Sequence, residues 1–285
     1  MPSQPFPRAL ETRMKVFISV DMEGICGVVA VRETDPEKGG ERYQTSRRLM
    51  TGEANAAIEG CLKAGAKEVL VADSHWNFDN LLPEELHEAA VLLRGQPRPF
   101  SMVHGLDGTF NAAMFVGFHA MAGTPRAIID HTFTGRIRSV EVNGRAVGET
   151  GVNAYLAGHY DVPIVLVTGD SAVAAEAQGL LKGVHTVAVK EAIGASAAKN
   201  LHPKRARESI RAEAEKALRE AAKIPPLKAA KPVRMAVEFH ESTSADRAEI
   251  APSVTRVGAT RIEFTAPNFF EAFRIFNAAE TLSGT

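Results

Sequence analysis

Four residues whose side chains can bind a metal ion follow apolar runs at three separate places in the chain. They are Asp21, Glu23, His75 and His119. Two carboxylates and two imidazoles make a mixed oxygen and nitrogen ligand set, which suits zinc and, less uniquely, manganese or cobalt. The residue types therefore predict a metal site, provided that the fold brings these distant positions together.

Asp21 and Glu23 are the two candidate ligands that most require a bound cation. Side chains alternate along an extended chain, so both carboxylates point to the same side. Gly24 then lets the backbone turn without steric penalty. Two carboxylates held this close repel each other unless a proton or a cation lies between them. Taken singly, a strand-end Asp is more often a turn or cap residue and a single His more often structural, but four such residues at three successive strand ends favour a metal site.

The elements that must position these residues form an alternation of strands and helices. Several of the apolar runs are continuous, as expected for strands that are covered on both faces of a parallel sheet. We predict strands at 15–20, 68–72, 113–118, 163–168 and 184–189, with helices at 43–64 and 170–181. This pattern predicts an α/β fold with an open, mostly parallel sheet flanked by helices. Sites in such sheets lie beyond the carboxyl ends of the strands, where the four residues would meet.

The character of the sequence changes after about residue 190. A charged amphipathic helix is predicted at 203–223, then two alternating strands at 233–239 and 258–264, and a helix at 267–280. We therefore predict three parts: a flexible N-terminal extension (1–13), an α/β metal-binding catalytic domain (14–190), and a smaller C-terminal α+β domain (191–285) that serves assembly or gates the pocket. Within the middle part, Asn143-Gly144 predicts a β-hairpin.

Composition narrows the class of protein and its partners. Of 285 residues, 33 are basic and 34 acidic, for a net charge of −1. This balance argues against nucleic acid or an acidic membrane as a partner, and no apolar run approaches the roughly 18 residues of a membrane span. The two cysteines, Cys26 and Cys61, occur without an export signal, which predicts a cytoplasmic protein.

Two further residues attract attention for different reasons. His131 lies in a loop rich in Gly and Thr, of the kind that carries function. Glu149 follows the predicted hairpin and precedes a helix, where its ordinary role would be to compensate the helix N-terminus. The sequence contains no GxGxxG, GxxxxGK[ST], HExxH or GxSxG motif, so neither a phosphate loop nor a serine nucleophile is indicated.

Several segments, in order, resemble the D-aminopeptidases, a family of binuclear zinc peptidases of bacteria. The resemblance extends over roughly residues 14 to 200, and the S-x-D-x-E-G opening followed by the other segments is specific. The segments are SVDMEGICG (19–27), VLVADSH (69–75), PRPFSMVHGLDGTF (97–110), FVGFHA (115–120), DHTF (130–133), VGETGVNAYLAGHYDVP (147–163) and VTGD (167–170).

The resemblance implies a complete site and an activity. It places metal ligands at Asp21, Glu23, His75, His119 and Glu149, and a catalytic histidine at His131. Five ligands exceed what one catalytic zinc with an open position takes, and they fit two zinc ions per subunit with one carboxylate, expected to be Asp21, between them. The implied reaction is release of N-terminal amino acids from short peptides such as D-Ala-D-Ala, by attack of a zinc-activated hydroxide on the peptide carbonyl. The preference for D-residues and a homo-oligomeric, ten-subunit double ring come from the resemblance alone.

Two other functions remain open at this point. A binuclear metal phosphoesterase uses similar ligand sets, although few arginines, with Arg126, Arg136 and Arg138 as the candidates, lie in the segments expected near the site. A non-catalytic peptide- or metal-binding component of an uptake system is the other. Activity on phosphate esters would favour the first, and an absence of turnover on any dipeptide would favour the second.

Overall fold

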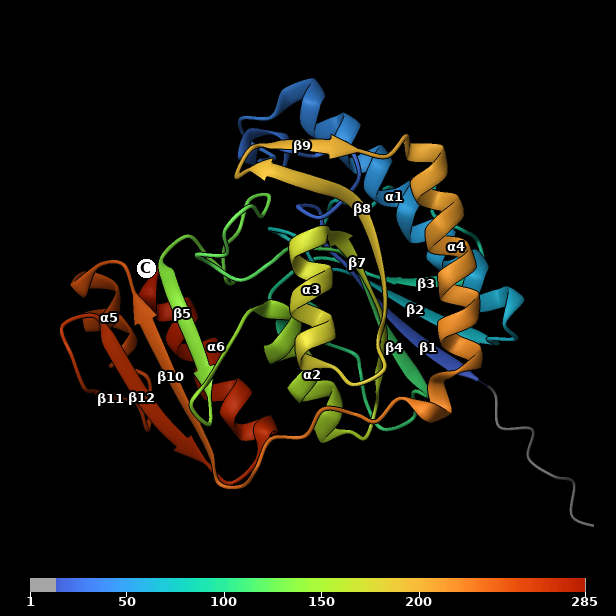
Figure 1. Ribbon diagram of the computed structural model, residues 1–285. Helices are drawn as coiled ribbons and strands as arrows, with labels where there is room; N and C mark the ends of the chain where they lie inside the picture. Colours follow the sequence, from blue (N-terminus) through green and yellow to red (C-terminus); the bar gives the residue numbers. More distant parts are fainter. Residues whose placement is uncertain (1–13, 285) are drawn as a thin grey trace, which may run out of the picture.

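The computed structural model describes residues 14–284, and the predicted flexible extension at 1–13 lies outside the described residues. A seven-stranded sheet runs through the larger part of the molecule, with the strand order β3-β2-β1-β4-β7-β8-β9 (Figure 1). All neighbouring strands are parallel except β8 and β9, which are antiparallel. The strands are β1 (Lys15–Val20), β2 (Glu68–Asp73), β3 (Ala90–Leu93), β4 (Ala112–Phe118), β7 (Ile164–Asp170), β8 (His185–Gly194) and β9 (Ala197–Asn200). The predicted open, mostly parallel sheet is confirmed.

Helices cover both faces of this sheet. On one face α1 (Gly40–Lys63) and α4 (Pro203–Arg219) lie side by side, and on the other lie α2 (Glu149–His159) and α3 (Ser171–Leu180) (Figure 1). Short 3-10 turns at Val31–Glu33, Ser101–Val103 and Ala221–Lys223 complete the connections. Within β1, Phe17 packs into one hydrophobic cluster and Ile18 into the other, both fully buried. The continuous apolar run is therefore explained by burial on both faces.

The register of the central strands decides where the site forms. Val20, at the end of β1, is level with Asp73 on β2 and with Val116 on β4. Because the three strands are parallel, the residues that follow them leave the sheet at the same edge. The segments containing Asp21, His75 and His119 are thus neighbours in space, as the strand-end pattern predicts.

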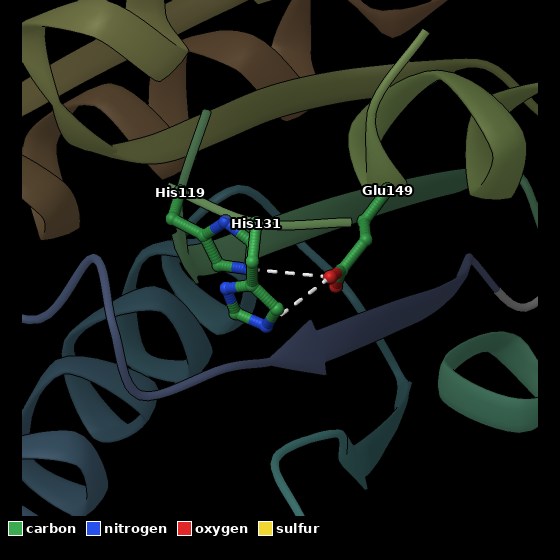
Figure 2. A group of neighbouring side chains, drawn as sticks. All are labelled: His119, His131 and Glu149. Carbon is green, nitrogen blue, oxygen red and sulfur yellow. Dashed lines mark ion pairs between the residues drawn. The ribbon is translucent and has the colours of Figure 1, made fainter. Parts of the chain in front are cut away.

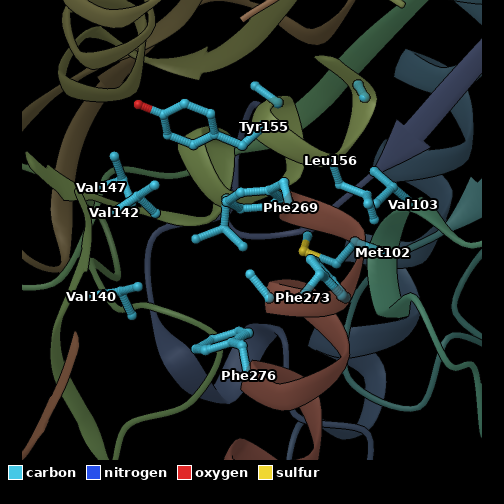
Figure 3. Packing of buried hydrophobic residues seen from close by; sticks show 14 of the residues in the cluster. Met102, Val103, Val140, Val142, Val147, Tyr155, Leu156, Phe269, Phe273 and Phe276 are labelled. Carbon is cyan, nitrogen blue, oxygen red and sulfur yellow. The ribbon is translucent and has the colours of Figure 1, made fainter. Parts of the chain in front are cut away.

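A second, antiparallel sheet has the order β11-β12-β10-β5-β6. Its strands are β5 (Ile137–Val142), β6 (Arg145–Val147), β10 (Val233–Phe239), β11 (Thr255–Arg256) and β12 (Arg261–Ala266). Two helices, α5 (Ser242–Ala248) and α6 (Phe269–Ser283), accompany it. The aromatic side chains of α6 pack against α2 and the inner face of this sheet, in one cluster with side chains that line the large sheet (Figure 3).

The two sheets do not divide the chain at residue 190. The hairpin β5–β6, with Asn143 and Gly144 at positive φ in its turn, pairs with β10 and so belongs to the smaller sheet. Conversely, β9 and α4, which follow residue 190, complete the larger sheet and its helical layer. The reason is that an amphipathic face specifies burial but not a partner: α4 buries Ala206, Ile210 and Ala214 in the same cluster as α1. Among residues 14–284, no helix is long and apolar enough to cross a membrane.

Candidate metal centre

The turn after β1 is shaped by an unusually close approach to the end of β4. The Asp21 amide donates to the Val116 carbonyl at 2.8 Å, and the Gly24 amide donates to the Gly117 carbonyl at 2.7 Å. A Cβ atom on Gly24 would lie 1.9 Å from the Phe118 carbonyl oxygen, so only glycine fits there. This contact lets the chain carrying Asp21 and Glu23 pass directly over the end of β4.

Asp21 lies between two imidazoles. Its Oδ1 is 3.3 Å from His75 Nδ1, and its Oδ2 is 3.5 Å from His119 Nε2. All three side chains are almost completely buried. Each carboxylate oxygen of Asp21 faces a different imidazole. Asp21 therefore connects two halves of the site, one around His75 and the other around His119.

Each half has a second carboxylate. Glu23 Oε2 is 3.0 Å from His75 Nδ1 on one side. On the other side Glu149 Oε1, at the first position of α2, is 3.3 Å from His119 Nε2 and 3.6 Å from His131 Nε2 (Figure 2). The six residues selected from the sequence therefore form one continuous cluster of three carboxylates and three imidazoles.

Backbone carbonyls hold all three imidazoles in one defined orientation. His75 Nε2 donates to the Thr34 carbonyl at 2.8 Å, His119 Nδ1 to the Ala120 carbonyl at 3.0 Å, and His131 Nδ1 to the Ile129 carbonyl at 2.9 Å. A carbonyl oxygen only accepts, so these nitrogens carry the ring protons. The other nitrogen of each neutral ring then presents a lone pair to the carboxylates, which is how histidines are arranged when they bind metals.

The polar atoms of this buried cluster are arranged as metal ligands are. The buried atoms Glu23 Oε2 and His119 Nε2 have no hydrogen-bond partner. Lone pairs that face carboxylates at 3.0–3.6 Å repel them unless a proton or a cation lies between. His119 groups with His131 and Glu149, and again with Asp21 and Glu23, as sets whose ligand atoms lie within 4.8 Å of one another.

The pKa values of Asp21, His75 and His119 are all raised, which means that the cluster favours bound protons. Burial, reinforced by Glu23, raises the pKa of Asp21 to about 8. Burial would lower the pKa of His75 and His119, yet their carboxylate neighbours more than offset it and raise both well above 6.5. In the metal-free protein, protons therefore supply the positive charge that metal ions would otherwise supply.

His131 differs from the other two imidazoles. Its side chain is 25% exposed, and its ring stacks on His119 with 4.0 Å between centroids. Burial, followed by the nearby His119, lowers its pKa below 6.5. His131 is thus a neutral imidazole at the rim of the cluster, with a lone pair on Nε2.

Two other acidic residues at strand ends serve the backbone and not the cluster. Asp170 caps α3 by accepting from the Val173 amide at 2.9 Å, and it accepts from the Ile128 amide at 2.8 Å. Asp73 accepts from Asn80 and from the Leu81 amide. Asp170 therefore anchors the loop that leads to His131.

The backbone carbonyl groups that orient the three imidazoles have no side-chain signature, so sequence patterns do not reveal them.

Comparison with known proteins agrees with this architecture. A family model described as D-aminopeptidase matches residues 14–278. A D-aminopeptidase of Bacillus subtilis (strain 168) is 40% identical over 262 residues, which cover 92% of this chain and 94% of the relative. A solved structure, the Zn-dependent D-aminopeptidase DppA from Bacillus subtilis, described as a self-compartmentalizing protease, superposes with a TM-score of 0.92 at 39% identity, covering 95% of this chain and 98% of that one.

The α/β sheet and the buried carboxylate and imidazole cluster beyond its strand ends, together with these similarities, define the class as a zinc metallopeptidase. Within that class, the chain belongs to the D-aminopeptidase family, since the family model spans nearly all of the described residues. The predicted family and fold are confirmed.

Proposed function

We propose that this protein is a zinc-dependent aminopeptidase that releases N-terminal D-amino acids from short peptides such as D-Ala-D-Ala. The similarity to D-aminopeptidases over more than nine-tenths of the chain supports this activity. The observation that carries the proposal is the buried cluster in which three imidazole lone pairs face three carboxylates.

Five side chains are proposed to hold two zinc ions per subunit. They are Asp21, Glu23, His75, His119 and Glu149. Asp21 is assigned the shared position because its two oxygens face different imidazoles. When bound, a zinc pair supplies a Lewis acid for the peptide carbonyl and a water of lowered pKa.

His131 is proposed to carry a proton during the reaction. Its Nδ1 proton is fixed on the Ile129 carbonyl, so Nε2 is the atom that accepts a proton and passes it to the leaving amine. Its lowered pKa keeps Nε2 free to accept at neutral pH. Stabilisation of an oxyanion would instead require a proton already on Nε2, which this environment disfavours. General acid–base assistance of this kind contributes about 10²–10⁴-fold to a rate.

A homo-oligomer in the cytoplasm, with ten subunits in a double ring, is proposed as the working form. The similar structure described as a self-compartmentalizing protease supports a homo-oligomer, whereas the subunit count rests on the family resemblance and the location on the sequence. Of the three candidate arginines, Arg136 gives a phosphoesterase function no support, because its guanidinium is engaged by Glu280 at 3.3 Å and Ser283 at 3.3 Å.

The activity is tested with a panel of D- and L-aminoacyl dipeptides, assayed with and without a chelator. We expect hydrolysis of the D-aminoacyl substrates that is abolished by chelation and restored by zinc. Full activity in a metal-free preparation would overturn the metal role, whereas turnover of L-substrates alone would overturn only the stereochemical assignment.

A further inference from the structure

Lys190 is a buried lysine within a strand, a position where an ammonium group needs strong compensation. It lies on β8, directly after the apolar residues Val187, Ala188 and Val189, and is 2% exposed. No other lysine among residues 14–284 is buried to this degree. A charged side chain is almost never fully buried unless it is paired or hydrogen-bonded, so its contacts indicate what it does.

All the hydrogen bonds of its ammonium group go to one loop. Lys190 Nζ donates to the carbonyls of Glu23 at 2.5 Å, Ile25 at 2.9 Å and Val28 at 2.5 Å. An ammonium group has three protons, and here each has a carbonyl acceptor. The loop that carries Glu23 is therefore gathered around one cation.

The loop has few other ways to satisfy these carbonyls. It is irregular and buried from Met22 to Cys26, and buried backbone groups without partners are costly. The amides of Gly24 and Cys26 are bound elsewhere, the first by the end of β4 and the second by the buried Glu53 carboxylate at 2.8 Å. Within the loop, the Val28 amide donates to one of the three carbonyls, that of Ile25, at 3.1 Å. Lys190 supplies the donors on the carbonyl side.

We propose that Lys190 is a positioning residue for the metal centre, because it fixes the Glu23 backbone and thereby holds the Glu23 carboxylate beside Asp21 and His75. This inference rests on the proposed role of Glu23 as a zinc ligand. Lys190 touches no reacting group. It acts through the loop, in the way that groups behind metal ligands orient them.

The test is the zinc affinity of the purified full-length protein, measured by competition with a chromogenic chelator. Lys190→Met nearly keeps the volume of the side chain but removes the donors, and we expect about 10–100-fold weaker zinc binding, the usual effect of removing such a supporting contact. Lys199→Met is the matched control, since Lys199 is an exposed lysine on the adjacent strand β9. It should bind zinc like the parent protein.

A double-mutant cycle separates positioning from general destabilisation. If Lys190 acts through Glu23, Lys190→Met should weaken zinc binding no further in a Glu23→Ala background. In a Glu149→Ala background it should cost its full factor. The absorption spectrum of the cobalt-loaded protein should change in Lys190→Met and stay unchanged in Lys199→Met.

Three results would overturn the inference. One is unchanged zinc affinity in Lys190→Met, and another is an equal loss in both backgrounds. If Lys190→Met fails to fold, Lys190→Gln, which keeps a donor, is tested in its place with the same expectations. The third result is failure of both variants to fold, which would show that Lys190 stabilises the whole fold and not the metal centre in particular. A parent protein that binds no zinc would instead overturn the proposed function itself.

Discussion

The imidazoles of His119 and His131 are stacked, with 4.0 Å between ring centroids and 12° between ring planes. Both point their Nε2 atoms at the same Glu149 oxygen, Oε1, at 3.3 Å and 3.6 Å. Two rings this close do not readily carry two positive charges, and burial together with His119 keeps the pKa of His131 low. The pair therefore divides into a buried ligand and a neutral, partly exposed partner that is free to move a proton.

This division predicts different outcomes for the two histidines. His131→Ala should retain zinc and lose about 10²–10⁴-fold in turnover, the scale of general acid–base assistance. His119→Ala, at the buried end of the stack, should lose zinc. Metal analysis of both purified proteins, alongside dipeptide hydrolysis, checks the assignment. Loss of zinc from His131→Ala would make His131 a ligand.

Glu149 is the site residue with the most ordinary alternative role. It opens α2, where an acidic side chain merely compensates the helix N-terminus. As a ligand, Glu149→Ala should lower the zinc content of the purified protein. The matched control is Glu271→Ala, which removes an acidic side chain from the first turn of α6, away from the cluster, and should cost only about 0.3–1 kcal/mol of stability. An unchanged zinc content in Glu149→Ala would leave Glu149 as a helix-end charge.

The metal-free protein should become less stable as the pH rises. Asp21 has its pKa raised from 3.8 to about 8, chiefly by burial, and His75 and His119 have theirs raised above 6.5. Groups whose pKa is raised on folding stabilise the fold fully below the unfolded pKa, and they lose that contribution as the pH rises through the folded pKa.

Thermal melts between pH 6 and 9, with and without chelator, measure this effect. The melting temperature of the chelated protein should fall across this range. Zinc should suppress the fall, because it replaces the protons and its binding strengthens as they leave. If the melting temperature fell equally with pH in the chelated and the zinc-bound protein, the metal would not act at this cluster.

Gly24 should not tolerate a side chain. In Gly24→Ala the new Cβ would meet the Phe118 carbonyl at 1.9 Å, so we expect a loss of stability of at least about 1–3 kcal/mol and weakened zinc binding. Gly179→Ala is the control, since that Cβ meets nothing within 4 Å and lies in α3, where Ala stabilises a helix by about 0.5–1 kcal/mol relative to Gly. Chemical denaturation of both variants compares them directly, and equal stability would rule out the close approach.

The sequence predicts the part of the site that depends on strand order alone. Asp21, Glu23, His75 and His119 each follow a strand of a parallel sheet, so the topology itself brings them to one edge. Glu149 follows no such rule. It reaches the cluster because the hairpin β5–β6 leads the chain to the start of α2 beside His119, and only the resemblance to D-aminopeptidases selected it.

The long-range pairings were beyond sequence patterns for a physical reason. The hairpin β5–β6 joins β10, whose residues lie far along the chain, and hydrophobic alternation says which face of a strand is buried but not which strand it meets. In the same way, the predicted strand at 184–189 stops before Lys190, which lies inside β8, and the three carbonyl partners of this lysine follow only from the folded loop.

The most direct test of the central claim is a crystal structure of the zinc-loaded protein with anomalous diffraction measured at the zinc edge. We predict two strong anomalous peaks in each subunit, both within bonding distance of the cluster formed by Asp21, Glu23, His75, His119 and Glu149, with His131 bound to neither. Peaks at other residues, or no peak at this cluster in a protein that hydrolyses D-aminoacyl dipeptides, would contradict it.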